Sequence, residues 1–212
     1  KYQDLINRLM VYFAQKGRNQ VVVDYCQKLL GLDSCDQEAH LNLMKAYVAI
    51  GKPEQAVRQY QQCCQVLKNE LTAINQYWLH YRMLNHLGVK KLAEFERHES
   101  IDEMKHADMV SERILFLDGL PNFQLLGRLC IGETVDEVLK ADLDLEYEAV
   151  AVLKDAIEHS EKVRDYVSRD LFRQILDSEE EHVDTLETQF EMIERMGIQN
   201  YIQLNSKPEE AE

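Results

Sequence analysis

The chain has 212 residues, of which only eight are glycine and three are proline. So few turn-forming residues argue against a sandwich or barrel of many short strands and favour long helices joined by tight loops. The formal net charge of −14 argues against general binding to nucleic acid or to an anionic membrane surface. The chain shows neither a signal peptide nor an apolar run of roughly 18 residues, so we expect a cytoplasmic protein without a membrane span.

The charge is distributed unevenly along the chain. Residues 1–69 hold nine basic and six acidic residues, whereas residues 70–212 hold 15 basic and 32 acidic ones. This break indicates two parts of different origin. The five cysteines form no Cys-x-x-Cys pair, so the sequence predicts neither a disulfide framework nor a zinc knuckle.

The near-neutral part is predicted to form paired helices within residues 2–17, 18–33 and 33–51. Gly17 and Gly51 are 34 residues apart, which is the period of tetratricopeptide repeats. The string LDSCDQEAHLNLMKAYVAIGKPEQAVRQYQQCCQVLKNEL resembles the bacterial transcriptional activator domain, a helical-repeat module of regulatory proteins. We therefore predict a tetratricopeptide-like helical domain over residues 1–65.

The acidic part is predicted to form a four-helix bundle over residues 66–205. A helical pattern runs without glycine or proline from Pro53 to Gly88, so one helix crosses the charge break. Three more long helices are expected at about 89–118, 134–163 and 165–197, followed by a short fifth helix and a disordered acidic tail at 206–212. With a long crossover after the second bundle helix, this all-α arrangement has the ferritin-like topology.

Two Glu-x-x-His motifs carry the main chemical signal. Residues three apart lie on one face of a helix, so both members of a motif can reach one metal ion. Each motif follows a single glutamate by 33 residues, and the whole pattern repeats after 76 residues. The six residues are Glu70, Glu103, His106, Glu146, Glu179 and His182. One glutamate from each of two helices plus Glu-x-x-His from each of the other two is the ligand pattern of di-iron carboxylate bundles. Surface Glu-His pairs arising by chance are the alternative, and the doubled spacing argues against them.

Three longer strings closely resemble bacterioferritins: VLKNELTAINQYWLHYRML, HESIDEMKHADMVSERILFLDGLPNFQLLGRLCIGE and RDYVSRDLFRQILDSEEEHVDTLE. The resemblance runs from about residue 66 to 205. It implies an iron-storage subunit whose six ligands form a ferroxidase centre, where dioxygen or peroxide oxidises Fe(II). It also implies a homo-oligomeric cage of twenty-four subunits built of dimers, with ferric mineral stored inside.

The resemblance also points to accessory residues. Tyr77 matches a tyrosine beside the ferroxidase centre, although an ordinary core tyrosine is an equal alternative. His98 and Asp102 match inner-surface residues that bind iron in some members, and a solvated helix face is the alternative for them. The other histidines have no partner at ligand spacing and are expected to be packing or surface residues; they are His40, His80, His86 and His159.

Met104 is expected to face away from the metal centre, because it lies about 100° around the helix from Glu103. An outward methionine is usually a packing residue. In bacterioferritins the methionine of HESIDEMKHAD ligates haem b between two subunits, and a thioether is a reasonable haem ligand. The resemblance therefore implies that Met104 is a haem ligand at a two-fold interface.

The junction departs from the family pattern. Bacterioferritins begin their first helix about a dozen residues before the equivalent of Glu70, and here RQYQQCCQVLKN fits the last helix of the activator-type module instead. We interpret this as an engineered helical fusion. The alternative function is then a symmetric cage scaffold that displays the N-terminal domain, with iron chemistry incidental. A regulator with a sensory di-iron domain is a third interpretation.

Overall fold

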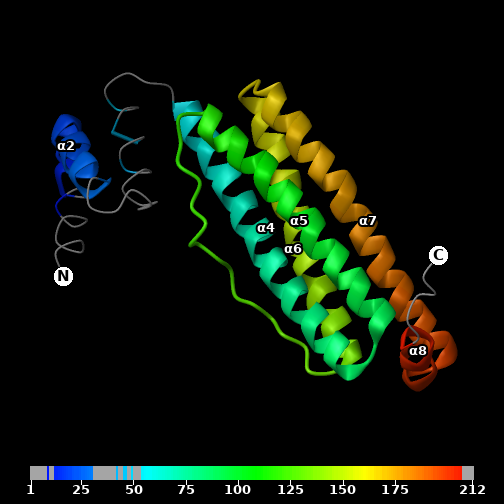
Figure 1. Cartoon of the computed structure of the whole chain (residues 1–212). Coiled ribbons are helices and arrows are strands. Elements are labelled where there is room, and N and C mark those ends of the chain that lie inside the picture. Colours follow the sequence, from blue (N-terminus) through cyan, green and yellow to red (C-terminus); the bar gives the residue numbers. More distant parts are fainter. Residues whose placement is uncertain are drawn as a thin grey trace. The chain divides into compact units, whose positions relative to one another are not determined.

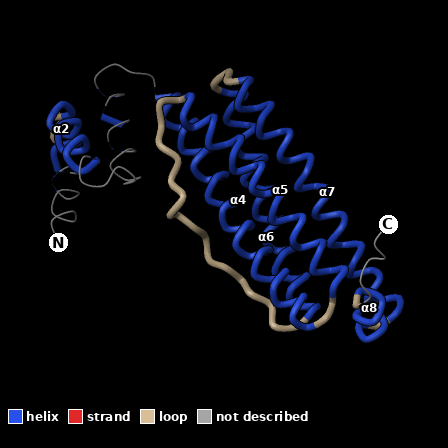
Figure 2. The backbone as a smooth tube through the Cα atoms, viewed as in Figure 1, coloured by secondary structure: helices blue, strands red, loops and turns tan. Residues whose placement is uncertain are grey.

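A computed structural model of the chain describes residues 9, 12–30, 42, 45, 46, 49 and 54–206, and all the elements there are helices (Figures 1 and 2). They are α2 (Asn19–Leu30), α4 (Glu54–Leu87), α5 (Lys90–Phe116), α6 (Val135–Lys162), α7 (Tyr166–Met196) and α8 (Ile198–Asn205). The all-α prediction is confirmed for this part of the chain. The helices expected within residues 2–17 and 33–51 lie largely outside the described residues, as does the acidic tail after Ser206.

Local capping residues explain where the helices begin and end. The side chain of Glu137 accepts from the backbone amide of Thr134 at 3.1 Å, which completes the predicted capping box of α6. At the start of α7, the carboxylate of Asp165 accepts from the amide of Ser168 at 3.1 Å. Gly88 has a φ of 84° and ends α4 in the left-handed conformation that glycine adopts without strain.

The chain divides into two compact units, which are described separately. The first comprises Lys1–Gln65 and Ser111–Gln124. In it Tyr60 is fully buried, and its hydroxyl donates to the carbonyl of Leu120 at 3.2 Å. The second comprises Val66–Val110 and Leu125–Glu212. The sequence did not anticipate that residues 111–124 would group with the first unit, and the predicted domain division stays a proposal.

The second unit is a four-helix bundle of α4 from Val66, α5 up to Val110, α6 and α7, and the connection from Leu125 to α6 runs along α4 (Figure 2). This segment is fixed by three backbone amides that donate to side chains on successive turns of α4. The pairs are Gly127 to Thr72, Cys130 to Gln76 and Gly132 to His80, at 2.8, 2.9 and 3.1 Å. The connection is the long crossover that the ferritin-like topology requires.

The interior of the bundle is apolar near α8 and polar farther along. Leu84, Leu139, Leu186 and Tyr201 are fully buried and belong to one cluster, to which α4, α6, α7 and α8 contribute. Next to it the interior holds buried glutamate, histidine, glutamine and aspartate side chains, and beyond these it is apolar again, with Leu67, Leu153, Phe172 and Ile175 buried. Within the described residues, no helix combines the length and the apolar character that a bilayer span needs.

Candidate metal centre

Four helices bring six acidic and imidazole side chains together in the polar part of the bundle. α4 and α6 supply one glutamate each, whereas α5 and α7 supply one Glu-x-x-His motif each. The six are Glu70, Glu103, His106, Glu146, Glu179 and His182, and each is at most 7% exposed. Because three residues make nearly one helical turn, both members of each motif lie on the buried face of their helix. The structure therefore brings together every residue of the predicted set.

The six residues form two overlapping groups of four. One group combines Glu70 and His106 with Glu103 and Glu179, and the ligand-type atoms all lie within 4.8 Å of one another. The other combines Glu146 and His182 with the same two glutamates. Glu103 and Glu179 thus belong to both groups and can bridge two metal ions. Each ion would then have one further glutamate and one histidine of its own.

The ring nitrogens confirm that the histidines face this cluster. His106 Nδ1 lies 3.1 Å from a carboxylate oxygen of Glu179 and 3.2 Å from one of Glu103. His182 Nδ1 lies 3.0 Å and 3.3 Å from oxygens of the same two glutamates. The two imidazole rings are 6.4 Å apart between their centroids. Both histidines therefore direct Nδ1 at the shared carboxylates.

The electrostatics reflect four carboxyl groups crowded in the buried interior of the bundle. Burial and the neighbouring carboxylates raise the pKa of Glu70 and of Glu146 well above the ordinary value. Burial alone would lower the pKa of His106, but the carboxylates of the surrounding glutamates outweigh it and raise that pKa to about 12. The pKa of His182 is raised because carboxylates surround it as well. Against the effect of burial, the two neighbouring histidines lower the pKa of Glu103.

The donor set fits divalent metal ions. Several of these buried atoms have no hydrogen-bond partner of suitable geometry among the described residues. They include Glu70 Oε2, Glu103 Oε1, both carboxylate oxygens of Glu179 and His182 Nδ1. Buried acceptors that converge without donors are costly unless a cation or protons compensate them. Carboxylate with imidazole is a ligand combination suited to iron, and binding would displace protons from these groups.

Tyr77 lies beside this cluster. It is fully buried on α4, its hydroxyl donates to Glu146 Oε1, and burial raises its pKa well above the ordinary value. Glu99 is a neighbour that sequence reasoning missed: it lies 2.7 Å from His182 Nε2, on the side of the ring opposite the other glutamates. Its position one turn before Glu103 on α5 is the signal that could have identified it.

The remaining predicted residues lie outside the cluster. Met104 is 44% exposed on α5, as expected for a residue that faces away from the centre. His98 is exposed, whereas Asp102 is half-buried and pairs with Lys105. His80 is fully buried, as a packing residue would be, but it also has a polar partner, Asp142 on α6, that the sequence did not reveal. That partner is 62 residues away, so spacing along one helix gave no sign of it.

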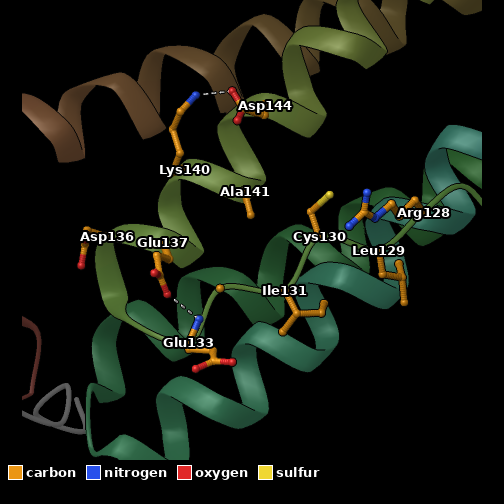
Figure 3. Close-up of a pocket in the computed structure, with 11 residues that line it drawn as sticks. Arg128, Leu129, Cys130, Ile131, Glu133, Asp136, Glu137, Lys140, Ala141 and Asp144 are labelled. Carbon is orange, nitrogen blue, oxygen red and sulfur yellow. Dashed lines mark hydrogen bonds and ion pairs between the residues drawn. The ribbon is translucent and has the colours of Figure 1, made fainter.

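A surface pocket of about 600 Å³ lies between the crossover segment and α6 (Figure 3). Its lining includes Arg128, Cys130 and Glu133 from the crossover and Lys140 and Asp144 from α6. Lys140 pairs with Asp144, so the charges at this end of the pocket are already compensated. None of the six cluster residues lines it. The groups of metal-ligand side chains found among the described residues all lie in the bundle interior.

Comparisons with known proteins assign both parts of the chain. The sequence pattern of the ferritin-like domain matches residues 63–196, and that of the bacterial transcriptional activator domain matches residues 4–75. Bacterioferritin from Brucella melitensis is 51% identical over 144 residues, which cover 68% of this chain and 89% of that protein. Bacterioferritin from Rhodobacter capsulatus is 45% identical over 145 residues, which cover 68% and 90%.

The fold and the doubled Glu-x-x-His site thus define a ferritin-like four-helix bundle with a carboxylate-rich dinuclear metal site. Within that class, the chain belongs to the bacterioferritin family, and its residues 4–75 are similar to the bacterial transcriptional activator domain. Both resemblances seen in the sequence are confirmed. The comparisons give no support to an engineered origin, which stays a prediction.

Glu99→Ala tests whether this residue orients His182. A carboxylate on the far nitrogen of a ligating imidazole fixes the ring, and losing it typically costs about 10–100-fold in metal affinity. We expect Co(II) titration followed by absorbance to show one weakened site and one unchanged site. Glu94→Ala, at an exposed position of the same helix, is the control. Equal weakening of both sites, or of neither, would contradict the assignment.

Proposed function

We propose that this chain is a ferroxidase and iron-storage subunit in which Glu103 and Glu179 bridge two iron ions. Two Fe(II) ions bind the six residues, each gives up one electron to dioxygen or peroxide, and the ferric product passes into a mineral. Glu70 and His106 complete one site, and Glu146 and His182 complete the other. The sharing of two buried glutamates between two four-residue groups is the observation that carries this proposal.

The residue types suit this reaction. Carboxylates are hard oxygen donors that favour the ferric state, and a site with few protein ligands leaves room for an oxidant. The hydroxyl of Tyr77 donates to Glu146, so we assign it the accessory role of orienting that carboxylate. His98 and Asp102 lie four residues apart on α5, and we propose them as a transfer site for iron on its way to the mineral.

We further propose that Met104 is a ligand of haem b. What supports this is its exposure of 44%, which leaves the thioether accessible at the surface of this chain, together with the bacterioferritin motif around it. Bound there, haem would supply one-electron transfer. Because Met104 points away from the cluster, its haem would be distinct from the dinuclear site.

Membership of the family supports a homo-oligomeric cage. We propose that it has twenty-four subunits built of dimers, that it lies in the cytoplasm and that it binds neither nucleic acid nor membrane. We retain the predicted division into a helical domain at 1–65, a bundle at 66–205 and a terminal tail at 206–212.

A cage scaffold is the second candidate function. What favours it is the junction: the two family matches overlap at residues 63–75, inside the uninterrupted helix α4. A continuous helix is a semi-rigid connection, which suits the display of one domain on another. In this interpretation the chain is an engineered fusion, and the iron chemistry of the bundle is incidental. Discovery of the whole arrangement in a genome would contradict the engineered origin.

Glu103→Ala tests the ferroxidase centre. Removing a bridging carboxylate disrupts both metal sites, so we expect the rate of ferric absorbance after aerobic addition of Fe(II) to fall to that of a protein-free solution. Glu94→Ala, which changes an exposed glutamate on the same helix, should oxidise Fe(II) like the unmodified protein. An unchanged rate in Glu103→Ala would eliminate this cluster as the catalyst.

Met104→Leu tests the haem assignment. Leucine keeps the volume but lacks the thioether, so reconstitution with haem b should give no low-spin absorption spectrum. Met109→Leu makes the same change at a half-buried methionine of α5 and should leave haem binding intact. Retention of the spectrum in Met104→Leu would rule out this ligand.

Particle size tests the cage. Analytical ultracentrifugation is expected to show one species of twenty-four chains of 24.8 kDa each. This assembly is common to the storage function and to the scaffold alternative. A species of dimer size would contradict both, because mineral storage and a cage scaffold each need a closed particle.

A further inference from the structure

A second buried polar cluster lies in the bundle, separate from the six residues of the metal centre. It consists of Gln76 and His80 on α4, Glu96 on α5 and Asp142 on α6, and each is at most 1% exposed. One ring nitrogen of His80 and one carboxylate oxygen each of Glu96 and Asp142 lie within 4.8 Å of one another. Two carboxyl groups this close and this deeply buried need either a cation or a proton between them.

The hydrogen bonds of His80 exclude it as a metal ligand in this arrangement. The backbone amide of Gly132 can only donate, and it lies 3.1 Å from His80 Nε2, so that nitrogen is an acceptor. The ring proton must then be on Nδ1, which lies 2.8 and 2.9 Å from the two oxygens of Asp142. A neutral imidazole with one nitrogen accepting and the other donating has no lone pair left for a metal.

Asp142 is held as a carboxylate by donors. It accepts from His80 Nδ1 and, at 2.9 Å, from Gln76 Nε2. The orientation of the Gln76 amide is fixed, because its oxygen accepts from the amide of Cys130 at 2.9 Å. Asp142 therefore carries the negative charge of the cluster and has capacity to accept a further hydrogen bond.

Glu96 has the opposite surroundings. Neither of its oxygens has a donor among the described residues, although the side chain is fully buried. The groups that face it are uncharged or acidic: Tyr77 and His80 on α4, Glu99 on its own helix, Asp142 on α6 and Tyr201 on α8. The hydroxyl of Tyr201 donates elsewhere, to Gln189. Burial and the charge of Asp142 raise the pKa of Glu96 well above its ordinary value.

We propose that Glu96 is protonated in the native protein, donates this proton in a hydrogen bond to Asp142, and thereby acts as a positioning residue for the metal centre. Asp142 lies one turn before Glu146 on α6, and Gln76 is next to Tyr77, whose hydroxyl donates to Glu146. The cluster thus ties α4, α5 and α6 together immediately beside that contact. An ionised Glu96 would repel Asp142 and displace the turn that leads to Glu146.

Infrared spectroscopy tests the proton directly. Zn(II) is first added to occupy the metal centre and ionise its glutamates, so that these no longer contribute to the absorption of protonated carboxyl groups. We expect the unmodified protein at neutral pH to retain a carbonyl band of a protonated carboxyl group that shifts in D₂O, and Glu96→Gln to lose it. Glu94→Gln, on the exposed face of the same helix, should keep the band. Persistence of the band in Glu96→Gln would overturn the proposal. So would a third Zn(II) per chain that the unmodified protein binds and Glu96→Gln does not.

Stability of the metal-free protein gives a second readout. A carboxyl group whose native pKa is raised holds its proton in the folded state but loses it in the unfolded chain above about pH 4.5, the ordinary value. Folding is therefore progressively disfavoured as the pH rises from that value towards the native pKa. Glutamine has no such linkage. The melting temperature of Glu96→Gln minus that of the unmodified protein should therefore increase between about pH 5 and pH 8. A difference that stays constant over this range would contradict the proposal.

The positioning role rests on the proposed ferroxidase function and has its own test. Glu96→Gln keeps an N–H donor for Asp142 and should oxidise Fe(II) at nearly the original rate, whereas Glu96→Leu should be several-fold slower. Equal rates for the two variants would refute positioning. If the unmodified protein does not oxidise Fe(II) but the infrared band is lost in Glu96→Gln, the ferroxidase assignment fails while protonation of Glu96 stands.

Discussion

Like charges held close together in a water-poor bundle interior are the constraint on which the rest of the structure depends. Glu70, Glu103, Glu146 and Glu179 converge there, and isolated buried carboxylates are too costly to persist without compensation. At the metal centre the compensation can come from two cations, because both histidines direct an Nδ1 at the shared glutamates. Buried carboxylates that are costly to leave uncompensated favour the binding of cations at this place.

The neighbouring cluster meets the same constraint in a different way. The charge of Asp142 is balanced by N–H donors and, in our proposal, by the proton of Glu96. Both ring nitrogens of His80 already have hydrogen-bond partners. Similar residue types therefore serve two purposes within one bundle. The two clusters differ in the ring nitrogen that faces the carboxylates. In His80 this nitrogen is Nδ1, which already carries a proton and so cannot bind a metal ion.

The polar residues form a band within an otherwise apolar interior. Large apolar side chains such as Leu139 and Tyr201 gather near α8, and Phe172 and Ile175 are buried beyond the metal centre, so that burial of apolar surface stabilises the fold on both sides of the band. The polar region lacks that contribution and is instead held by specific hydrogen bonds between helices and from the crossover to α4. Substitutions in the polar region should thus affect metal binding more sharply than comparable changes on the exposed face.

The sequence by itself determined the helices and the residues of the candidate site. Caps such as Thr134 and the scarcity of glycine act locally, so predicted ends lie within two residues of those of α4 to α7. A spacing of three residues fixes the helix face, which is why all six predicted residues meet. Only the tertiary structure decided which glutamates are shared, that Glu99 contacts His182, and that His80 pairs with Asp142. Those contacts depend on the rotation and depth of neighbouring helices, which periodicity along a single helix does not specify.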